Sequence, residues 1–119
     1  MTTWEPQVAA IPGGGQGALR EARELMRAKD FDKAQQVLNA LLAKNPQFAH
    51  ARMMLGNLHF RKKRFDQALN EYQQALERNP KLAPAPLMMG IIYSIQKEPQ
   101  NALEHFEMAV DIDPDLVVA

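Results

Sequence analysis

The sequence contains no cysteine, and its 119 residues include one tryptophan and two tyrosines. Without cysteine the chain has no disulfide, no thiolate nucleophile and no cysteine-ligated metal site, which fits a reducing compartment. A net charge is also lacking, because 14 basic side chains balance 14 acidic ones. A neutral chain has no overall attraction for nucleic acid or for an anionic membrane, so we expect neither as a partner.

Long apolar runs and a secretory signal are also missing. The longest stretch without charge, Leu82 to Gln96, has fifteen residues, whereas a membrane helix needs about 20 apolar residues. The N-terminal segment 1–17 lacks the basic start and the apolar core of a secretory signal. We therefore expect a cytoplasmic protein that does not cross a membrane.

The residue patterns of common active sites are absent too. His50, His59 and His105 are scattered, without the paired spacing of a metal site or the serine or cysteine partner of a nucleophilic site. Asp111 and Asp113 lack the glycine and the terminal glutamate of a calcium loop. We predict that the protein is not an enzyme and binds no cofactor or metal.

What the sequence does contain is one residue pattern that recurs with a period of 34. The clearest copy has Leu55-Gly56, Ala68, Tyr72, Ala75 and Pro80. The copy one period later has Met89-Gly90, Ala102, Phe106, Ala109 and Pro114, and the copy one period earlier has Ala22, Ala34, Leu38, Leu41 and Pro46. Three copies without an insertion predict a repeat architecture.

Each copy has two runs of apolar residues at three- and four-residue spacing, which is typical of amphipathic helices. A proline disfavours helical geometry in the residue before it, so Asn45, Asn79 and Asp113 are expected to end the second helix of each copy. The predicted helices are 16–28, 33–44, 49–62, 66–78, 84–96 and 99–112. Asp32 is expected to cap the second of them.

The period divides the chain into five segments. These are an N-terminal arm (1–14), three repeats (15–48, 49–82 and 83–116) and a short tail (117–119). The arm contains Trp4, two prolines and a glycine cluster without any periodicity, which predicts a flexible segment. Its glycines lack the Gly-Lys-Ser/Thr ending of a phosphate-binding loop, so we interpret them as a linker.

Two glycines lie in the middle of predicted helices. Gly56 and Gly90 cost about 0.5–1 kcal/mol each relative to alanine at such positions. We infer that the second helix of the same repeat approaches closely there, with the small residues Ala68 and Ala102 facing the glycines.

These spacings resemble the tetratricopeptide repeat, and the resemblance covers nearly the whole chain, from about Gly15 through Leu116. The family's first-helix tryptophan is replaced by Ala18, Arg52 and Pro86. The resemblance implies an all-α fold, a right-handed superhelical solenoid of three antiparallel helix pairs. It also implies a protein-protein interaction module, because the first helices of such repeats line a concave groove that binds a peptide or a helix of a partner.

The resemblance also indicates which residues line the groove. Carried over residue by residue, they are Leu19, Arg23, Met26, Arg27, His50, Met53, Asn57, Phe60, Arg61, Leu87, Ile91, Ser94 and Ile95. One subgroup of the family, the heat-shock chaperone adaptors, holds a C-terminal carboxylate with lysine, asparagine and arginine at five groove positions. Those positions here carry Leu19, Arg23, Met54, Pro84 and Met88. This clamp is absent, although Arg23 with Arg27 or Arg61 can still take a lone carboxylate.

The first helix of the third repeat carries no charge on any face. Helical spacing assigns Met88, Met89, Ile92 and Tyr93 to the core. The repeat register points Leu87, Ile91 and Ile95 into the groove, where exposed apolar side chains mark a contact surface and methionines such as Met53 adapt to varied partners. We hypothesise that the groove binds an apolar or amphipathic segment, with the chain's own 4–11 arm as one candidate occupant.

Charge is uneven along the chain, and this keeps a second hypothesis open. The basic run Arg61 to Arg64 is predicted to be a solvated turn. From Glu98 onward the acidic residues have no lysine or arginine among them. The last helix would lack a next neighbour. This leaves Leu103, Phe106, Val110 and Ile112 as a candidate self-association face. The alternative to a groove-binding adaptor or assembly scaffold is therefore a self-associating homo-oligomer, or a fragment of a longer repeat array.

Overall fold

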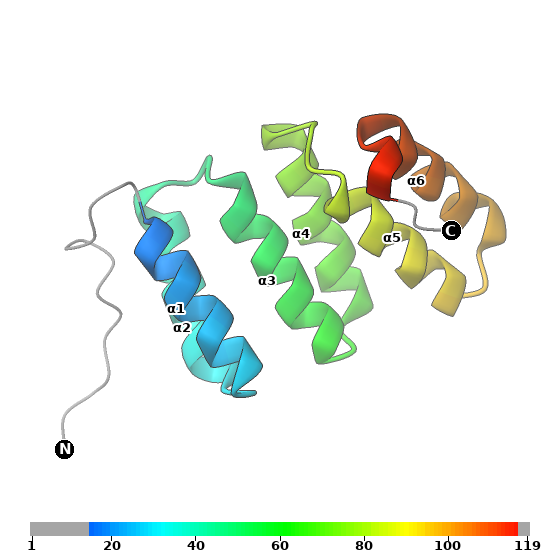
Figure 1. Cartoon of the computed structure of the whole chain (residues 1–119). Coiled ribbons are helices and arrows are strands. Elements are labelled where there is room, and N and C mark those ends of the chain that lie inside the picture. Colours follow the sequence, from blue (N-terminus) through cyan, green and yellow to red (C-terminus); the bar gives the residue numbers. More distant parts are fainter. Residues whose placement is uncertain (1–14, 117–119) are drawn as a thin grey trace, which may run out of the picture.

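A computed structural model describes residues 15–116 and places in them six α-helices, a short 3-10 helix and no strand (Figure 1). The elements are α1 (Gln16–Arg27), α2 (Phe31–Lys44), α3 (Ala49–Arg61), α4 (Phe65–Arg78), α5 (Pro84–Ile95), α6 (Pro99–Ile112) and η1 (Pro114–Leu116). The predicted arm (1–14) and tail (117–119) lie outside the described residues. The predicted all-α fold is confirmed.

The helices form three antiparallel pairs that follow one another along the molecule (Figure 1). Helix α1 packs on α2, α3 on α4 and α5 on α6, and successive pairs meet through α2 with α3 and through α4 with α5. The stack measures 50 × 27 × 25 Å. In such an elongated solenoid each pair contacts only the pairs next to it. Among the described residues, no helix combines the length and the apolar character that a membrane span requires.

The turn inside each pair is built in the same way. Lys29, Lys63 and Lys97 lie at the same position of successive repeats and have φ values of 63°, 61° and 60°, in the left-handed region. In the middle turn the amide N–H of Arg64 donates to the carbonyl oxygen of His59 at 2.8 Å. This pattern is that of a Schellman motif, which satisfies carbonyl groups at the end of the first helix. Sequence inspection placed these turns but missed their Schellman geometry, because no glycine marks the left-handed position.

The start of α2 differs from the prediction. The helix begins at Phe31, and Asp30 is its N-cap, with a carboxylate oxygen that accepts from the amide N–H of Lys33 at 3.4 Å. The predicted cap at Asp32 is wrong because the Schellman turn ends at Asp30 and the helix follows directly. Asp32 instead forms an ion pair with Lys62, with 3.6 Å between the carboxylate oxygen and Nζ.

The core consists of two clusters of buried side chains. The first joins α1, α2 and α3 through residues such as Leu38 and Leu58, and the second joins α3, α4 and α5 around Tyr72. Of the residues predicted to be core in α5, Met89 and Ile92 are buried. Met88 and Tyr93 are half-buried, and both pack against the second cluster.

The two mid-helix glycines do mark close helix crossings. A Cβ atom on Gly56 would lie 2.8 Å from the Tyr72 ring, and one on Gly90 would lie 2.6 Å from the Phe106 ring. The predicted partners Ala68 and Ala102 are therefore wrong. The residue that faces each glycine is the aromatic ring four positions further along the second helix. A flat ring pressed against the helix backbone leaves no space for a methyl group.

The first pair solves the same crossing with different residues. Its equivalent positions hold Ala22 and Leu38, and both side chains are fully buried in the first cluster. A leucine is smaller than a tyrosine, so the first helix can carry a Cβ there. In each pair the residue of the first helix is thus matched in size to the residue that it faces on the second helix.

Within residues 15–116, α6 packs mainly on α5 and on the adjoining 3-10 helix η1. Leu69 in α4 packs against the second cluster, whereas Leu103, its equivalent in α6, is 57% exposed. Tyr72 is fully buried, whereas the equivalent Phe106 is half-buried. The predicted self-association face is therefore partly open, and its other members, Val110 and Ile112, are also half-buried.

Candidate functional site

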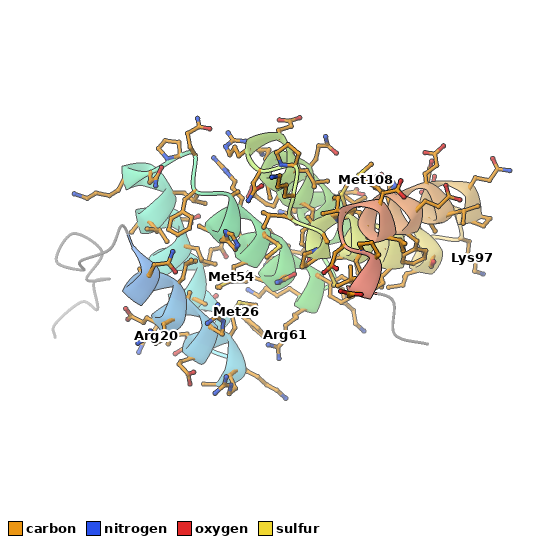
Figure 2. The ribbon with its side chains drawn as sticks, turned by 45° about the horizontal axis from the view of Figure 1, so that its top comes forward. Arg20, Met26, Met54, Arg61, Lys97 and Met108 are labelled. Carbon is orange, nitrogen blue, oxygen red and sulfur yellow. The ribbon has the colours of Figure 1, made fainter. Side chains whose placement is uncertain are left out.

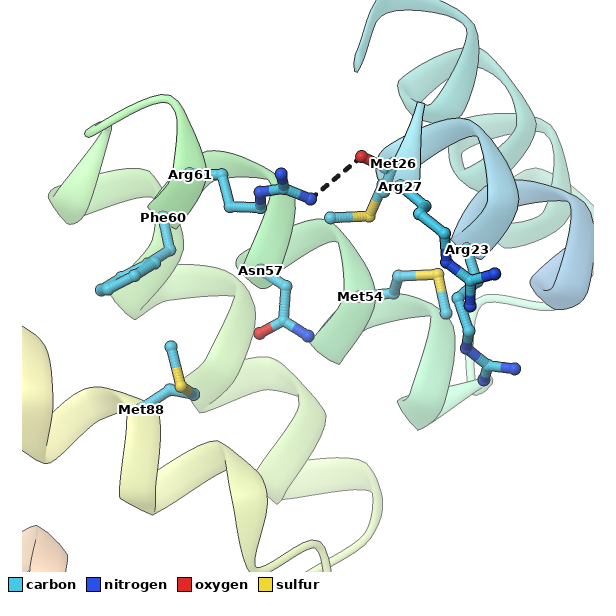
Figure 3. Close-up of a pocket in the computed structure, with 8 residues that line it drawn as sticks. All are labelled: Arg23, Met26, Arg27, Met54, Asn57, Phe60, Arg61 and Met88. Carbon is cyan, nitrogen blue, oxygen red and sulfur yellow. Dashed lines mark hydrogen bonds between the residues drawn. The ribbon is translucent and has the colours of Figure 1, made fainter. Parts of the chain in front are cut away.

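A cleft with a volume of about 620 Å³ opens between the first helices of the three pairs, α1, α3 and α5 (Figure 3). Its lining residues are Arg23, Met26, Arg27, Met54, Asn57, Phe60, Arg61 and Met88. The apolar members are buried or half-buried, and the three arginines are exposed. The cleft therefore has an apolar floor and a positively charged rim.

The floor of the cleft is rich in methionine. Met26 from α1 and Met54 from α3 lie next to each other, and Phe60 and Met88 lie on the side toward α5 (Figure 3). Methionine side chains are flexible and polarisable, so such a floor can adapt to apolar groups of different shape. The ring of Phe60 is held in place by an edge-on contact with Phe65, at 5.8 Å between ring centroids.

Asn57 brings a polar uncharged side chain to the lining of this cleft, and Tyr72 fixes its orientation. The Tyr72 hydroxyl donates to Oδ1 of Asn57 at 2.5 Å. Burial raises the pKa of the Tyr72 hydroxyl, so the hydroxyl stays protonated and remains a donor. Because the amide oxygen is engaged from behind, Asn57 offers its Nδ2 group to the cleft as a hydrogen-bond donor.

The three arginines of the rim differ in how firmly they are held. Nη1 of Arg61 donates to the carbonyl oxygen of Met26 at 3.0 Å, and its guanidinium lies 5.0 Å from the centre of the Phe31 ring. Arg61 therefore ties α3 to the first pair. Arg27 forms an exposed ion pair with Glu24 at 3.2 Å, which contributes little to stability. No carboxylate among residues 15–116 pairs with Arg23 in the structure.

Six of the eight cleft residues belong to the predicted groove, and Met54 and Met88 were not predicted to line it. Met54 was recognised only as an unfilled clamp position, and Met88 was assigned to the core. The signal that could have identified them is their place at two of the clamp positions. In this chain methionines occupy two of the positions at which chaperone adaptors have polar residues that bind a carboxylate.

Two other predicted groove residues, His50 and Met53, line a second hollow instead. This hollow has a volume of about 650 Å³ and lies between α3, the loop before α5 and the end of α6. Its other lining residues are Lys81, Leu82, Ala83, Pro84, Ile112 and Asp113. The predicted groove residues that line a hollow are therefore distributed over two of them.

The remaining predicted groove residues lie outside both hollows. Leu19 is buried in the first core cluster, which corrects its assignment to the groove. Its spacing with Ala22 and Met26 places it on the stripe of α1 that faces α2 and α3. In α5, Leu87 and Ile91 are half-buried, and Ser94 and Ile95 are exposed.

Two ionisable residues near the cleft are largely shielded from solvent. Arg52 of α3 and Glu71 of α4 form an ion pair with 3.5 Å between Nη1 and Oε2. Burial raises the pKa of Glu71, although the charge of Arg52 opposes that rise. The pair lies between the two helices of one hairpin and supports α3 from behind. Within residues 15–116 there is no cluster of histidine and acidic residues that could hold a metal ion.

Stacked helical hairpins with a cleft between their first helices define a helical-repeat solenoid. The chain matches the tetratricopeptide repeat family over residues 19–85 and 64–117, and it belongs to that family. This family is one of protein-interaction scaffolds. No curated protein matches the chain.

Several solved structures share the fold. MamA from Desulfovibrio magneticus RS-1 is similar with a TM-score of 0.74 and 21% identity, over 85% of this chain and 57% of that one. YrrB, a TPR protein described as having an unusual peptide-binding site, is similar with a TM-score of 0.75 and 24% identity, over 90% of this chain and 55% of that one. SycD, a type III secretion chaperone from Yersinia enterocolitica in complex with a peptide of YopD, is similar with a TM-score of 0.77 and 15% identity, over 82% of this chain and 75% of that one. The chain thus spans little more than half of MamA or YrrB, and identities this low show the fold alone.

Proposed function

We propose that the protein is an interaction module that binds a peptide or an amphipathic helix of a protein partner in the cleft between α1, α3 and α5. In this role it acts as an adaptor or assembly scaffold. The observation that carries the proposal is the combination of exposed arginines with a floor of methionine and phenylalanine in one cleft. YrrB and SycD, whose structures concern peptide binding, support this kind of ligand.

The chemistry of the cleft specifies the ligand further. Guanidinium groups pair with carboxylates, and Arg23 and Arg27 are exposed to accept them. Met26 and Met54 lie beside these arginines and fit an apolar side chain. The Nδ2 group of Asn57 suits a carbonyl oxygen of the bound segment. The preferred ligand therefore carries acidic residues interspersed with large apolar ones.

The second hollow extends this surface. Met53 lies one helical turn from Asn57 on α3 and His50 lies two turns away, so a bound segment that runs along α3 reaches both. Leu87, Ile91, Ser94 and Ile95 on α5 form the far edge of the same proposed surface. Leu19 is excluded from it by burial.

A direct test uses two labelled synthetic helices. One carries leucine and glutamate, and the other has the same leucines with lysine in place of glutamate. In fluorescence anisotropy at low salt, we expect the acidic helix to bind at least tenfold more tightly than the basic one. The variant Arg23→Glu/Arg27→Glu should reverse this preference, and Met54→Glu should weaken the binding of the acidic helix.

The matched control is Arg20→Glu/Lys44→Glu. It makes the same change in net charge at two exposed residues that do not line the cleft. This control should retain the preference for the acidic helix. Equal binding of the two helices to the native chain, or an equal loss in the control and in the cleft variant, would overturn the proposal.

A further inference from the structure

Charge is strongly segregated along the neutral chain. Residues 15–64 contain eleven basic and four acidic side chains, residues 65–97 contain three of each, and residues 98–116 contain six acidic side chains and no basic one. The basic part comprises the first pair and α3, and the acidic part comprises α6 and η1. The first pair and α6 lie at opposite ends of the stack, whose long axis measures 50 Å, and α3 lies between them (Figure 1).

The acidic end also presents apolar side chains to solvent. On the outer face of α6, Leu103 is 57% exposed and Met108 is 41% exposed. Glu104, Glu107 and Asp111 are exposed on the same helix. These five residues follow one another at spacings of one, three, one and three, so they form a single stripe along the helix. Apolar side chains interspersed with carboxylates are the chemistry that the cleft fits.

The cleft and the α6 stripe are far apart in one molecule. Met26, Met54 and Arg61 lie together near α1 and α3, whereas Met108 lies on α6, away from them (Figure 2). A stripe on a packed helix cannot reach the cleft of its own chain. It can reach the cleft of another.

We propose that the occupant of the cleft is a second copy of this chain, which inserts the outer stripe of its α6. Arg23 and Arg27 of one copy then pair with Glu104 and Glu107 of the other, while the methionine floor covers Leu103 and Met108. The inference rests on the proposed function, because it takes the cleft as a site for acidic apolar helices.

Charge also selects the orientation of the two copies. Pairing α6 with α6 would bring two acidic faces together, and like charges in contact are repulsive. Pairing two clefts would bring arginines together. Only the head-to-tail arrangement places opposite charges in contact. Such an interface is heterologous, so each copy keeps one free surface and the assembly can grow into a chain.

The test is sedimentation equilibrium of the full chain over a range of concentrations, in dilute buffer and in 1 M salt. The average mass should rise above 13.4 kDa with concentration in dilute buffer. It should fall back in 1 M salt, where the screening length is about 3 Å. Arg23→Glu/Arg27→Glu and Glu104→Lys/Glu107→Lys should each weaken the association at least tenfold.

Combining both pairs of substitutions in one chain restores opposite charges across the interface. We expect this fourfold variant to associate again. Two controls carry matched charge changes outside the interface, Arg20→Glu/Lys44→Glu and Asp66→Lys/Glu77→Lys, and they should associate like the native chain. All substituted residues in these variants and controls are exposed, so the fold should be retained.

Three outcomes would overturn the inference. The first is a native chain that stays monomeric throughout. The second is association that survives reversal of the cleft, because α6 would then bind elsewhere. The third is failure of the fourfold variant to associate. If the labelled acidic helix still binds to a chain that does not self-associate, the proposed function stands and the head-to-tail inference alone is lost.

Discussion

The contact between Gly56 and Tyr72 shows how a single residue pair fixes the distance between two helices. The ring lies 2.8 Å from the position that a Cβ atom of residue 56 would take, and its hydroxyl donates a hydrogen bond to Asn57 in the cleft. The crossing of α3 and α4 and the orientation of Asn57 therefore depend on the same tyrosine. The equivalent contact of Gly90 with Phe106 has no such hydrogen bond among the described residues, and its ring is half-buried.

We predict that Gly56→Ala lowers the free energy of unfolding by about 1–3 kcal/mol, because the buried Tyr72 ring cannot move away from the new methyl group. The matched substitution Gly90→Ala should cost less, since the half-buried Phe106 ring can shift toward solvent. Alanine also favours the helix by about 1 kcal/mol over glycine, which offsets part of both costs. Urea unfolding of the two variants checks this. A larger loss for Gly90→Ala would contradict it.

Predictions about single residues were correct where the feature depends on the sequence of one helix alone. The glycines were recognised as close crossings because their conformational cost is visible in the sequence. Their aromatic partners were missed because the residue that faces a glycine depends on how the second helix is rotated about its own axis. Leu19 was misplaced for the same reason, since the family position alone does not give the rotation of α1.

At the scale of elements, the turn between α3 and α4 concentrates positive charge above a buried histidine. His59 is buried, and its Nδ1 atom has no hydrogen-bond partner among the described residues. Burial lowers the pKa of His59, and the charges of Arg64 and Lys62 lower it further. A protonated His59 is therefore unfavourable in the folded state.

The lowered pKa predicts a loss of stability in mild acid. The unfolded chain has a His59 pKa of about 6.5 and binds the proton first, so the free energy of unfolding falls as the pH drops below that value. His59→Leu, which copies Leu25 at the equivalent position of the first pair, should reduce this loss. His50→Leu, at an exposed histidine, is the control. Urea unfolding midpoints measured from neutral to mildly acidic pH test this prediction. It would be contradicted if the midpoint changed equally with pH in the two variants.

The helices themselves could be predicted because their apolar spacing and the Asn-Pro and Asp-Pro pairs mark them directly. The Schellman geometry of the turns could not, because each turn has a lysine at the left-handed position that usually takes glycine. The composition of the cleft was also only partly predictable. Met54 and Met88 line the same cleft as the arginines because of how α1, α3 and α5 stack, and no single helix carries that information.

For the whole molecule, the linear stack predicts an uneven distribution of stability. Helices α3 and α4 contact a pair on each side, whereas α1 and α6 lie at the ends. We expect amide hydrogens of α3 and α4 to exchange last with solvent, and those of α6 at least tenfold faster, because few of the α6 side chains are buried. Native-state hydrogen exchange in high salt measures this. Equal protection of α3 and α6 would contradict it.

The separation of charge gives the molecule a permanent electric dipole along its 50 Å axis. Its behaviour at a charged surface therefore follows from its two ends rather than from its net charge of zero. An anion-exchange resin should retain it by α6 and a cation-exchange resin by the first pair. On each support all molecules turn the end named for that support toward the matrix, so an array immobilised in this way is already oriented.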